Sequence, residues 1–233
     1  MDLSIFDGLR ITFQKTKWSV LRCFKNFFLL LTWAVFVMGS CTLQGCSEQG
    51  SVVQSTAGAA QFSDTTLQTG DMIVRKGRGP ISDMLAQLNV KDKSWSHCGM
   101  VVVRNGQPFV FHSIGGEDNP KAVMRCDSLK RFLDSTWNNA FAVYRFDFDS
   151  PTRRRVAEQT LLFYQAKPRF DMAFDIATDS ALYCSELIYK IILRATHDTD
   201  YISRSVGYNR IFVGIDNLFL NRHATMVRKV VFK

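Results

Sequence analysis

Cysteine is scarce in the part of the sequence that is expected to fold. Beyond residue 46 only Cys98, Cys126 and Cys184 remain, so at least one thiol stays unpaired even in an oxidising compartment. An odd number this small excludes a disulfide-stapled scaffold. A bridge between Cys98 and Cys126 stays open at this stage.

The sequence also lacks the marks of several other protein classes. It has no internal repeat, and its basic residues do not interleave with aromatic ones as a nucleic-acid-binding stripe would. The triplet Arg153–Arg155 fits a solvated face at the start of a helix. The net charge of +8 suits attraction to anionic envelope polymers or lipid surfaces. We therefore expect no nucleic-acid partner, and no pattern indicates an oligomeric state.

No hydrophobic run is clearly long enough to span a membrane. Phe27–Met38 carries no charge and follows four basic residues between positions 15 and 25, which is the pattern of a secretory signal. A span needs roughly 20 apolar residues, and extending this run to Leu43 makes only a marginal case. A cleaved soluble signal peptide and an uncleaved anchor are the alternatives to a lipoprotein signal.

Two cysteines, Cys41 and Cys46, follow small residues just after this run. The segment resembles the lipobox of bacterial lipoprotein signals, which implies a lipidated cysteine at the mature N-terminus. Leu43, three residues upstream, favours Cys46, whereas Cys41 lies at the more usual distance from the charged region. The prediction is a signal peptide of lipoprotein type over 1–46 with Cys46 (or Cys41) lipidated, a flexible linker over 47–66, and one folded domain over 67–233.

Periodicity and turn signals predict an α+β domain with an antiparallel sheet packed against helices. The Asn105-Gly106 pair is the strongest short hairpin signal and joins two β-prone segments. The expected strands are 71–75, 97–103, 109–112, 122–125, 140–146 and 226–232, and the expected helices are 80–88, a segment capped by Asp127 or Ser128 and ending near 135, 151–165 and a helix that begins near 184.

The first strand of this hairpin begins with His97 and the second ends with His112. Strand alternation places His97, Gly99 and Val101 on one face, so Cys98 points away from His97 and is a candidate core residue. Whether His112 faces the same side depends on the hairpin register, which the residues alone leave open.

The segment Tyr183–Tyr189 holds the main candidate for chemistry. Leu187, Ile188, Ile191 and Ile192 recur at helical spacing, so Cys184 lies in the first turn of a helix. The free amide groups and the dipole at that end favour a thiolate. The simpler alternative is a cysteine that merely packs.

A nucleophilic cysteine needs a base, and His97 and His112 are the side chains best suited to supply one. Gly70-Asp71 with its strand, Ser96-His97-Cys98-Gly99, the strand ending in His112 and Tyr183-Cys184-Ser185-Glu186-Leu187 together resemble the permuted papain-like cysteine hydrolases. These are circularly permuted relatives of NlpC-type cell-wall peptidases, they include the YiiX-like amidases, and they are distantly similar to lecithin retinol acyltransferases.

The resemblance implies a permuted papain-like (NlpC-like) fold and a set of roles. Cys184 would be the nucleophile, His97 the general base and then acid, and His112 the orienting third residue. YiiX-like members usually carry glutamate at that third position, whereas the acyltransferase branch has histidine. The backbone amide of Cys184 would help to bind the oxyanion. Tyr183 and Trp95 are further oxyanion or cleft candidates, although each could simply pack.

The sequence therefore predicts a membrane-anchored cysteine hydrolase of the bacterial cell envelope that acts on a peptide or amide-linked substrate through a thioester. The alternatives are a lipid acyl hydrolase or acyltransferase with the same machinery, and a non-catalytic binding module. Two histidines and a cysteine are also legitimate zinc ligands, but no close His-x-x-x-His pair is present. We expect no metal and no cofactor.

Overall fold

The computed structural model describes residues 66–115, 121–207 and 209–233. The predicted signal peptide, the lipidation at Cys46 or Cys41 and nearly all of the predicted linker lie outside these residues. No helix in the described part of the chain has the length and apolar character needed to cross a membrane.

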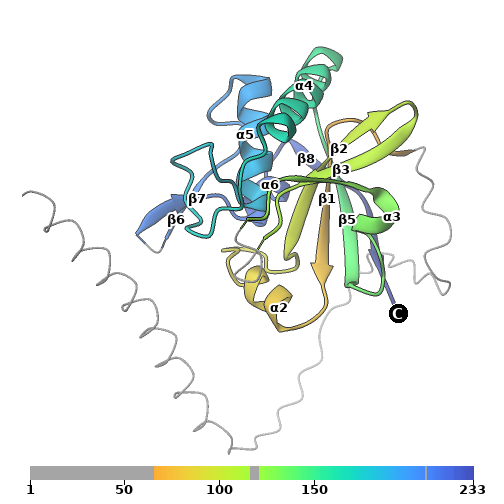
Figure 1. Ribbon diagram of the computed structural model, residues 1–233, viewed down its shortest axis with the longest axis vertical. Coiled ribbons are helices and arrows are strands. Elements are labelled where there is room, and N and C mark those ends of the chain that lie inside the picture. Colours follow the sequence, from red (N-terminus) through yellow and green to blue (C-terminus); the bar gives the residue numbers. More distant parts are fainter. Residues whose placement is uncertain (1–65, 116–120, 208) are drawn as a thin grey trace, which may run out of the picture. The chain divides into compact units, whose positions relative to one another are not determined.

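The predicted α+β architecture is present, with one antiparallel sheet of six strands in the order β4-β3-β2-β1-β5-β8 (Figure 1). Its strands are β1 (Asp71–Gly77), β2 (His97–Arg104), β3 (Gln107–His112), β4 (Arg125–Ser128), β5 (Asn138–Phe146) and β8 (Ala224–Val231). The helices are α2 (Pro80–Ala86), α3 (Leu129–Phe132), α4 (Ser150–Ala166), α5 (Cys184–Thr196) and α6 (Ile215–Phe219), and a separate ribbon pairs β6 (Ser205–Gly207) with β7 (Arg210–Phe212).

The sheet separates two hydrophobic layers because side chains alternate along each strand. On one face Cys98, Met100 and Phe111 pack with α5, α4 and α6, and α5 runs beside α4 (Figure 1). On the other face Val101 and Val110 pack with α3. The chemistry of the domain therefore depends on what each strand presents to which face.

The β2–β3 hairpin turns at Asn105 and Gly106, which both have positive φ (51° and 74°), as a tight two-residue turn requires. Met100 pairs with Phe111, so Gly99 lies opposite His112. The register left open by the sequence is thereby settled: His97 and His112 face the same side of the sheet, and Cys98 faces the other side.

The expected strand over 122–125 was placed too early. The strand is β4, Arg125–Ser128, and Val110 of β3 pairs with Asp127. Ser128, not Asp127, caps α3 by accepting a hydrogen bond from the Arg131 amide, and the helix ends at Phe132 rather than near residue 135. Asp127 is therefore a strand residue that faces the same side as His112.

A Cys98–Cys126 bridge does not form, and both cysteines are free. The β3 strand lies between the strands that carry them, which separates their backbones by roughly 10 Å. Disulfides need Cα atoms within about 7 Å. The bridge is excluded by sheet order.

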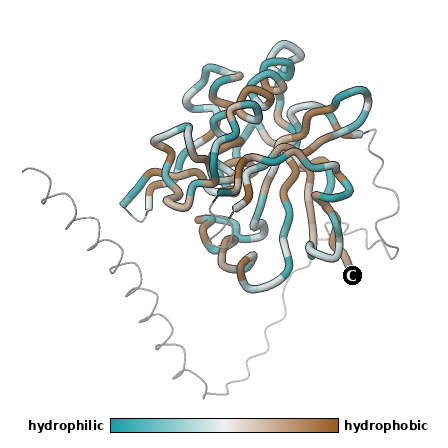
Figure 2. Tube along the Cα trace, viewed as in Figure 1, coloured by the Kyte–Doolittle hydropathy of each residue, from teal (hydrophilic) through white to brown (hydrophobic). Residues whose placement is uncertain are grey.

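The predicted helix near residue 80 forms as α2 but adds little to the core. Of its residues only Ala86 is buried, whereas Ile81 and Met84 are exposed; the α2 segment carries brown, hydrophobic stretches in Figure 2. The stability of the domain therefore comes from the two faces of the sheet.

Gly99 is a point where the sheet tolerates no side chain. A Cβ there would lie 2.5 Å from Cγ1 of Val110 and 3.2 Å from Cβ of His112. We expect Gly99→Ala to lower the free energy of unfolding by about 1–3 kcal/mol through overpacking, measured by urea denaturation. Thr225→Ala, at an exposed position of β8, is the control and should change stability far less. An unchanged midpoint for Gly99→Ala would contradict the close packing.

Candidate active site

Cys184 is the first residue of α5, as the helical spacing predicted. Leu187, Ile188, Ile191 and Ile192 are fully buried, which holds the helix against β2 and α4. Glu186 accepts a hydrogen bond at Oε2 from the Tyr183 amide, so this carboxylate caps the helix start. The helix is thus fixed at the end that carries the thiol.

The half-buried Cys184 thiol lies against Cys98, not only against its own helix. A hydrogen bond from the Cys98 thiol lowers the pKa of Cys184, burial opposes this, and the backbone amides of Cys98 and Ser185 add to the lowering. Burial raises the pKa of Cys98 well above its usual value, so Cys98 keeps its proton and acts as a donor. The helix start contributes as predicted, but the neighbouring thiol is the larger cause.

Three side chains on neighbouring strands form a hydrogen-bonded relay. Nε2 of His97 lies 2.9 Å from Nδ1 of His112, and Nε2 of His112 lies 3.0 Å from Oδ2 of Asp127. His97 and His112 are both buried, and Phe132 contacts both rings. The relay therefore runs from β2 through β3 to β4, with both imidazoles buried and Asp127 half-buried.

The carboxylate of Asp127 sets the tautomers along this relay. Hydrogen bonding to His112 lowers the pKa of Asp127 to about 2, so the carboxylate only accepts and Nε2 of His112 must carry a proton. Nδ1 of neutral His112 then accepts from Nε2 of His97. Nδ1 of His97 is left with a free lone pair, which is the form that a general base needs.

Both imidazoles are neutral at pH 7. Burial is the first cause that lowers the pKa of His97 well below its usual value, and the charge of Arg75 is the second. Burial also lowers the pKa of His112, although the hydrogen bond to Asp127 opposes it. The arrangement therefore offers Cys184 a neutral base rather than an imidazolium.

Within the described residues no hydrogen bond joins Cys184 directly to His97. The two are connected through Cys98, which follows His97 in β2 and contacts Cys184. A second link is Ser113, the residue after His112, whose buried hydroxyl donates to the carbonyl of Leu182 at 2.6 Å. Nucleophile–base distances are often looser without substrate. Two fixed contacts therefore join the strands that carry the relay to the start of α5.

The two further candidates from the sequence serve as anchors. The buried hydroxyl of Tyr183 accepts a hydrogen bond from the Val213 amide at 2.9 Å, which ties the start of α5 to the segment before α6. Trp95 is buried in the core, and its carbonyl accepts a hydrogen bond from Asn89 at 2.8 Å. Trp95 thus holds the loop that leads into His97.

Sequence reasoning missed the role of Asp127, which it considered only as one of two candidate helix caps beside Ser128. The available signal was an acidic residue two positions after Arg125 in a β-prone segment, where alternation places both on one face. A neutral imidazole orients its neighbour less firmly than a carboxylate does, and Asp127 supplies a carboxylate as the next member of the relay after His112.

The zinc alternative does not fit these residues. Both ring nitrogens of His112 bond to protein partners, which leaves none for a metal. Across residues 66–115, 121–207 and 209–233, no three His, Cys, Asp or Glu side chains converge as metal ligands.

Comparison with known proteins gives one family. The model of the family described as "Permuted papain-like amidase enzyme, YaeF/YiiX, C92 family" matches residues 66–203. The chain is 30% identical over 129 residues to the uncharacterized protein YiiX of Escherichia coli (strain K12). That alignment covers 55% of this chain and 58% of YiiX, so the chain spans less than two thirds of this relative.

A solved structure shares the fold. It is the crystal structure of a protein described as metalloprotein yiiX from Escherichia coli O157:H7, with a TM-score of 0.57 and 21% sequence identity. The match covers 70% of this chain and 98% of that one. The permuted papain-like architecture is therefore shared along nearly the whole length of that structure.

Asp127 makes the stability of the domain depend on pH in the acidic range. Its pKa of about 2 lies below the value of about 3.9 in an unfolded chain, so its contribution, at most about 2 kcal/mol, is full above pH 4 and is lost as pH falls toward 2. We expect Asp127→Asn to remove this part of the pH dependence of unfolding, measured in urea between pH 2 and 7. Asp200→Asn, at an exposed position, is the control. Parallel curves for wild type and Asp127→Asn would contradict the relay.

Proposed function

The chain belongs to the permuted papain-like amidase family YaeF/YiiX, C92, and on that premise we propose that it is a cysteine amidase that cleaves its substrate through a thioester on Cys184. The observation that carries the proposal is the His97–His112–Asp127 relay, whose two hydrogen bonds leave Nδ1 of His97 as a base. A binding module has no need for a hydrogen-bonded relay of buried histidines.

In the first half-reaction, Nδ1 of His97 takes the thiol proton as the sulfur of Cys184 attacks the substrate carbonyl carbon. The C=O electrons move to oxygen, and the backbone amide of Cys184, which has no partner within its helix, donates to this oxyanion. When the oxyanion reforms the carbonyl, the C–N bond breaks and His97 returns the proton to the leaving amine. The acyl group remains on sulfur as a thioester.

In the second half-reaction a water molecule replaces the amine. His97 accepts a proton from the water as its oxygen attacks the thioester carbon, and the proton then returns to the sulfur as the C–S bond breaks. The products are the free acid and the original thiol. Throughout, His112 and Asp127 hold His97 in one tautomer and stabilise its charge, and neither contacts the reacting atoms.

The setting of this chemistry is also a proposal. The basic segment before Phe27–Met38 and the cysteine at position 46 (or 41) support a lipid-anchored protein of the bacterial cell envelope, facing the periplasm or the exterior. In that setting the substrate would be a peptide or another amide-linked component of the envelope. The part of the chain beyond that cysteine also carries a net positive charge, which suits an anionic surface.

Ester chemistry is the second candidate. The observation that favours it is the histidine at position 112, as in the acyltransferase branch that the motifs resemble. The same thioester would form from a lipid ester, and a second acceptor in place of water would make the protein an acyltransferase. Paired amide and ester substrates with identical acyl groups separate the two: the better kcat/KM identifies the physiological bond type.

Replacing the nucleophile gives the most direct test. Cys184→Ala should reduce turnover by at least about a thousand-fold and remove the iodoacetamide adduct from the peptide that contains residue 184, as seen by mass spectrometry. Cys126→Ala is the matched control, since this free cysteine of β4 has its side chain on the face opposite Asp127, and it should keep both. Full activity in Cys184→Ala would sink the mechanism.

The pH dependence tests the base. His97 must be neutral to accept a proton, and its pKa is well below 6.5. Protonation of His97 should therefore leave kcat/KM unchanged between pH 6.5 and 8 and lower it only at more acidic pH. Arg75→Gln removes the second cause of the lowered pKa and should move the acidic limb to higher pH. An acidic limb centred at or above pH 6.5 in the wild type would show that His97 is not the base.

A further inference from the structure

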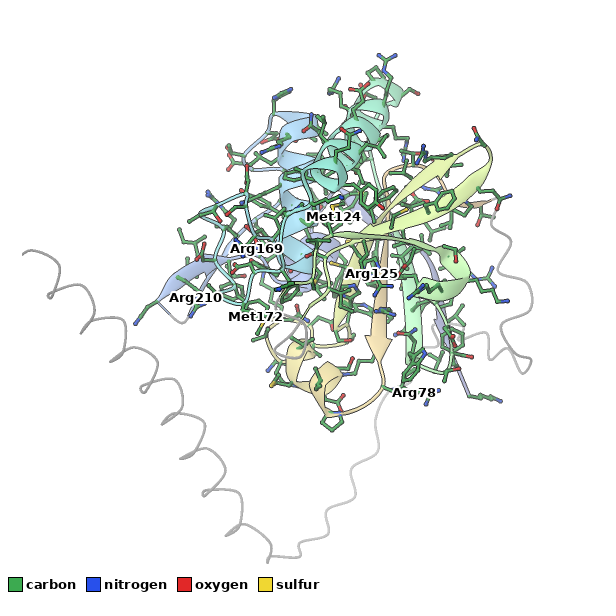
Figure 3. The ribbon with its side chains drawn as sticks, in the orientation of Figure 1. Arg78, Met124, Arg125, Arg169, Met172 and Arg210 are labelled. Atoms are coloured by element: carbon green, nitrogen blue, oxygen red, sulfur yellow. The ribbon has the colours of Figure 1, made fainter. Side chains whose placement is uncertain are left out.

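A cavity of about 360 Å³ opens over the His112 end of the relay. Its lining includes Arg75, His112, Arg125, Asp127, Arg131 and Trp137. Arg125 lies between α5 and α3 in the view of Figure 3, and the indole of Trp137, 69% exposed, stands on the wall of the cavity. Three arginines from β1, β4 and α3 therefore face one space.

The acidic groups of the cavity are already engaged. Asp127 accepts at Oδ2 from His112, and its Oδ1 pairs with Arg125 at 3.2 Å and with Arg131 at 3.5 Å. Asp134, the other carboxylate, is exposed to solvent and accepts from the Thr136 amide. A guanidinium has five N–H donors, so Arg125 and Arg131, with side chains 41% and 69% exposed, keep donors for a further acceptor.

The cavity adjoins the proposed catalytic groups. Arg75 pairs with His97 across β1 and β2, donates to the Phe132 carbonyl at 3.0 Å and stacks on the Phe132 ring. Burial lowers the pKa of Arg75, and the negative charges of Asp127 and of an ionised Cys184 oppose this lowering. A molecule held by these arginines would therefore lie beside the relay and within electrostatic reach of the thiol.

We propose that this cavity is a substrate subsite that binds an anionic oxygen group, a carboxylate or a phosphate, carried near the bond to be cleaved. The planar fork of arginine matches both groups. Arg125 and Arg131 are the ligands at the mouth, and Arg75 supplies positive charge at the base. As a substrate subsite, this site rests on the proposed amidase function, which it narrows to substrates that bear such a group.

Binding is tested without turnover, in the Cys184→Ala protein. The indole N–H resonance of Trp137 is followed by NMR during titration, at constant ionic strength, with N-acetylglycine, inorganic phosphate and the neutral N-acetylglycinamide. We expect saturable shifts with an anion and none with the amide. The tighter of the two anions identifies a carboxylate or a phosphate as the natural group.

The arginine variants decide whether the cavity is responsible. Arg125→Gln and Arg131→Gln should each weaken anion binding by about 10-fold or more, because each removes charge-assisted hydrogen bonds, and Arg131→Lys should recover part of the loss. Arg154→Gln, an exposed arginine of α4, is the control and should leave the affinity unchanged. Matched thermal unfolding of each variant separates lost binding from lost folding.

Three results would overturn the subsite: no saturable shift with either anion, equal binding of the amide, or equal weakening by Arg154→Gln. The binding experiment and the turnover experiment can fail separately. Selective anion binding in a wild-type chain with no Cys184-dependent turnover would refute the amidase but support the anion site. Cys184-dependent turnover without anion binding would refute the subsite alone.

Discussion

The hydrogen bond between Asp127 and His112 is the contact on which the arrangement of the site depends. A carboxylate that only accepts fixes the proton of His112, and His112 in turn fixes the proton of His97. The position of each proton along the relay thus follows from one ionised group. Burial contributes the other half, because it keeps both imidazoles neutral. A solvent-exposed pair of histidines would exchange tautomers freely.

This contact exists because three strands pair in a particular register. His112 lies opposite Gly99 and one strand away from Asp127, and the missing side chain at Gly99 gives His112 the room to lie over β2. The opposite face of β2 carries Cys98, which meets the thiol at the start of α5. The strand β2 therefore carries the base and, at the next residue, a contact to the nucleophile.

Local patterns predicted those parts of the fold that local physics controls. The Asn105-Gly106 turn, the alternation after His97 and the apolar spacing after Cys184 each specify an element from neighbouring residues, and each was right. Asp127 could not be found in this way, because the start of β4 is set by pairing with β3 and not by propensity. Likewise, alternation identified Cys98 as a core residue, but its hydrogen bond to Cys184 depends on how α5 packs.

The buried bond from Ser113 to the Leu182 carbonyl joins positions 69 residues apart, and this has a kinetic consequence. Contacts so distant along the chain form only after the entropy of closing a long loop has been overcome. The hairpin of β2 and β3 needs no such closure and can assemble early. A folding chain would thus hold its two histidines together well before the thiol reaches them. Reactivity of Cys184 would then report completion of the domain.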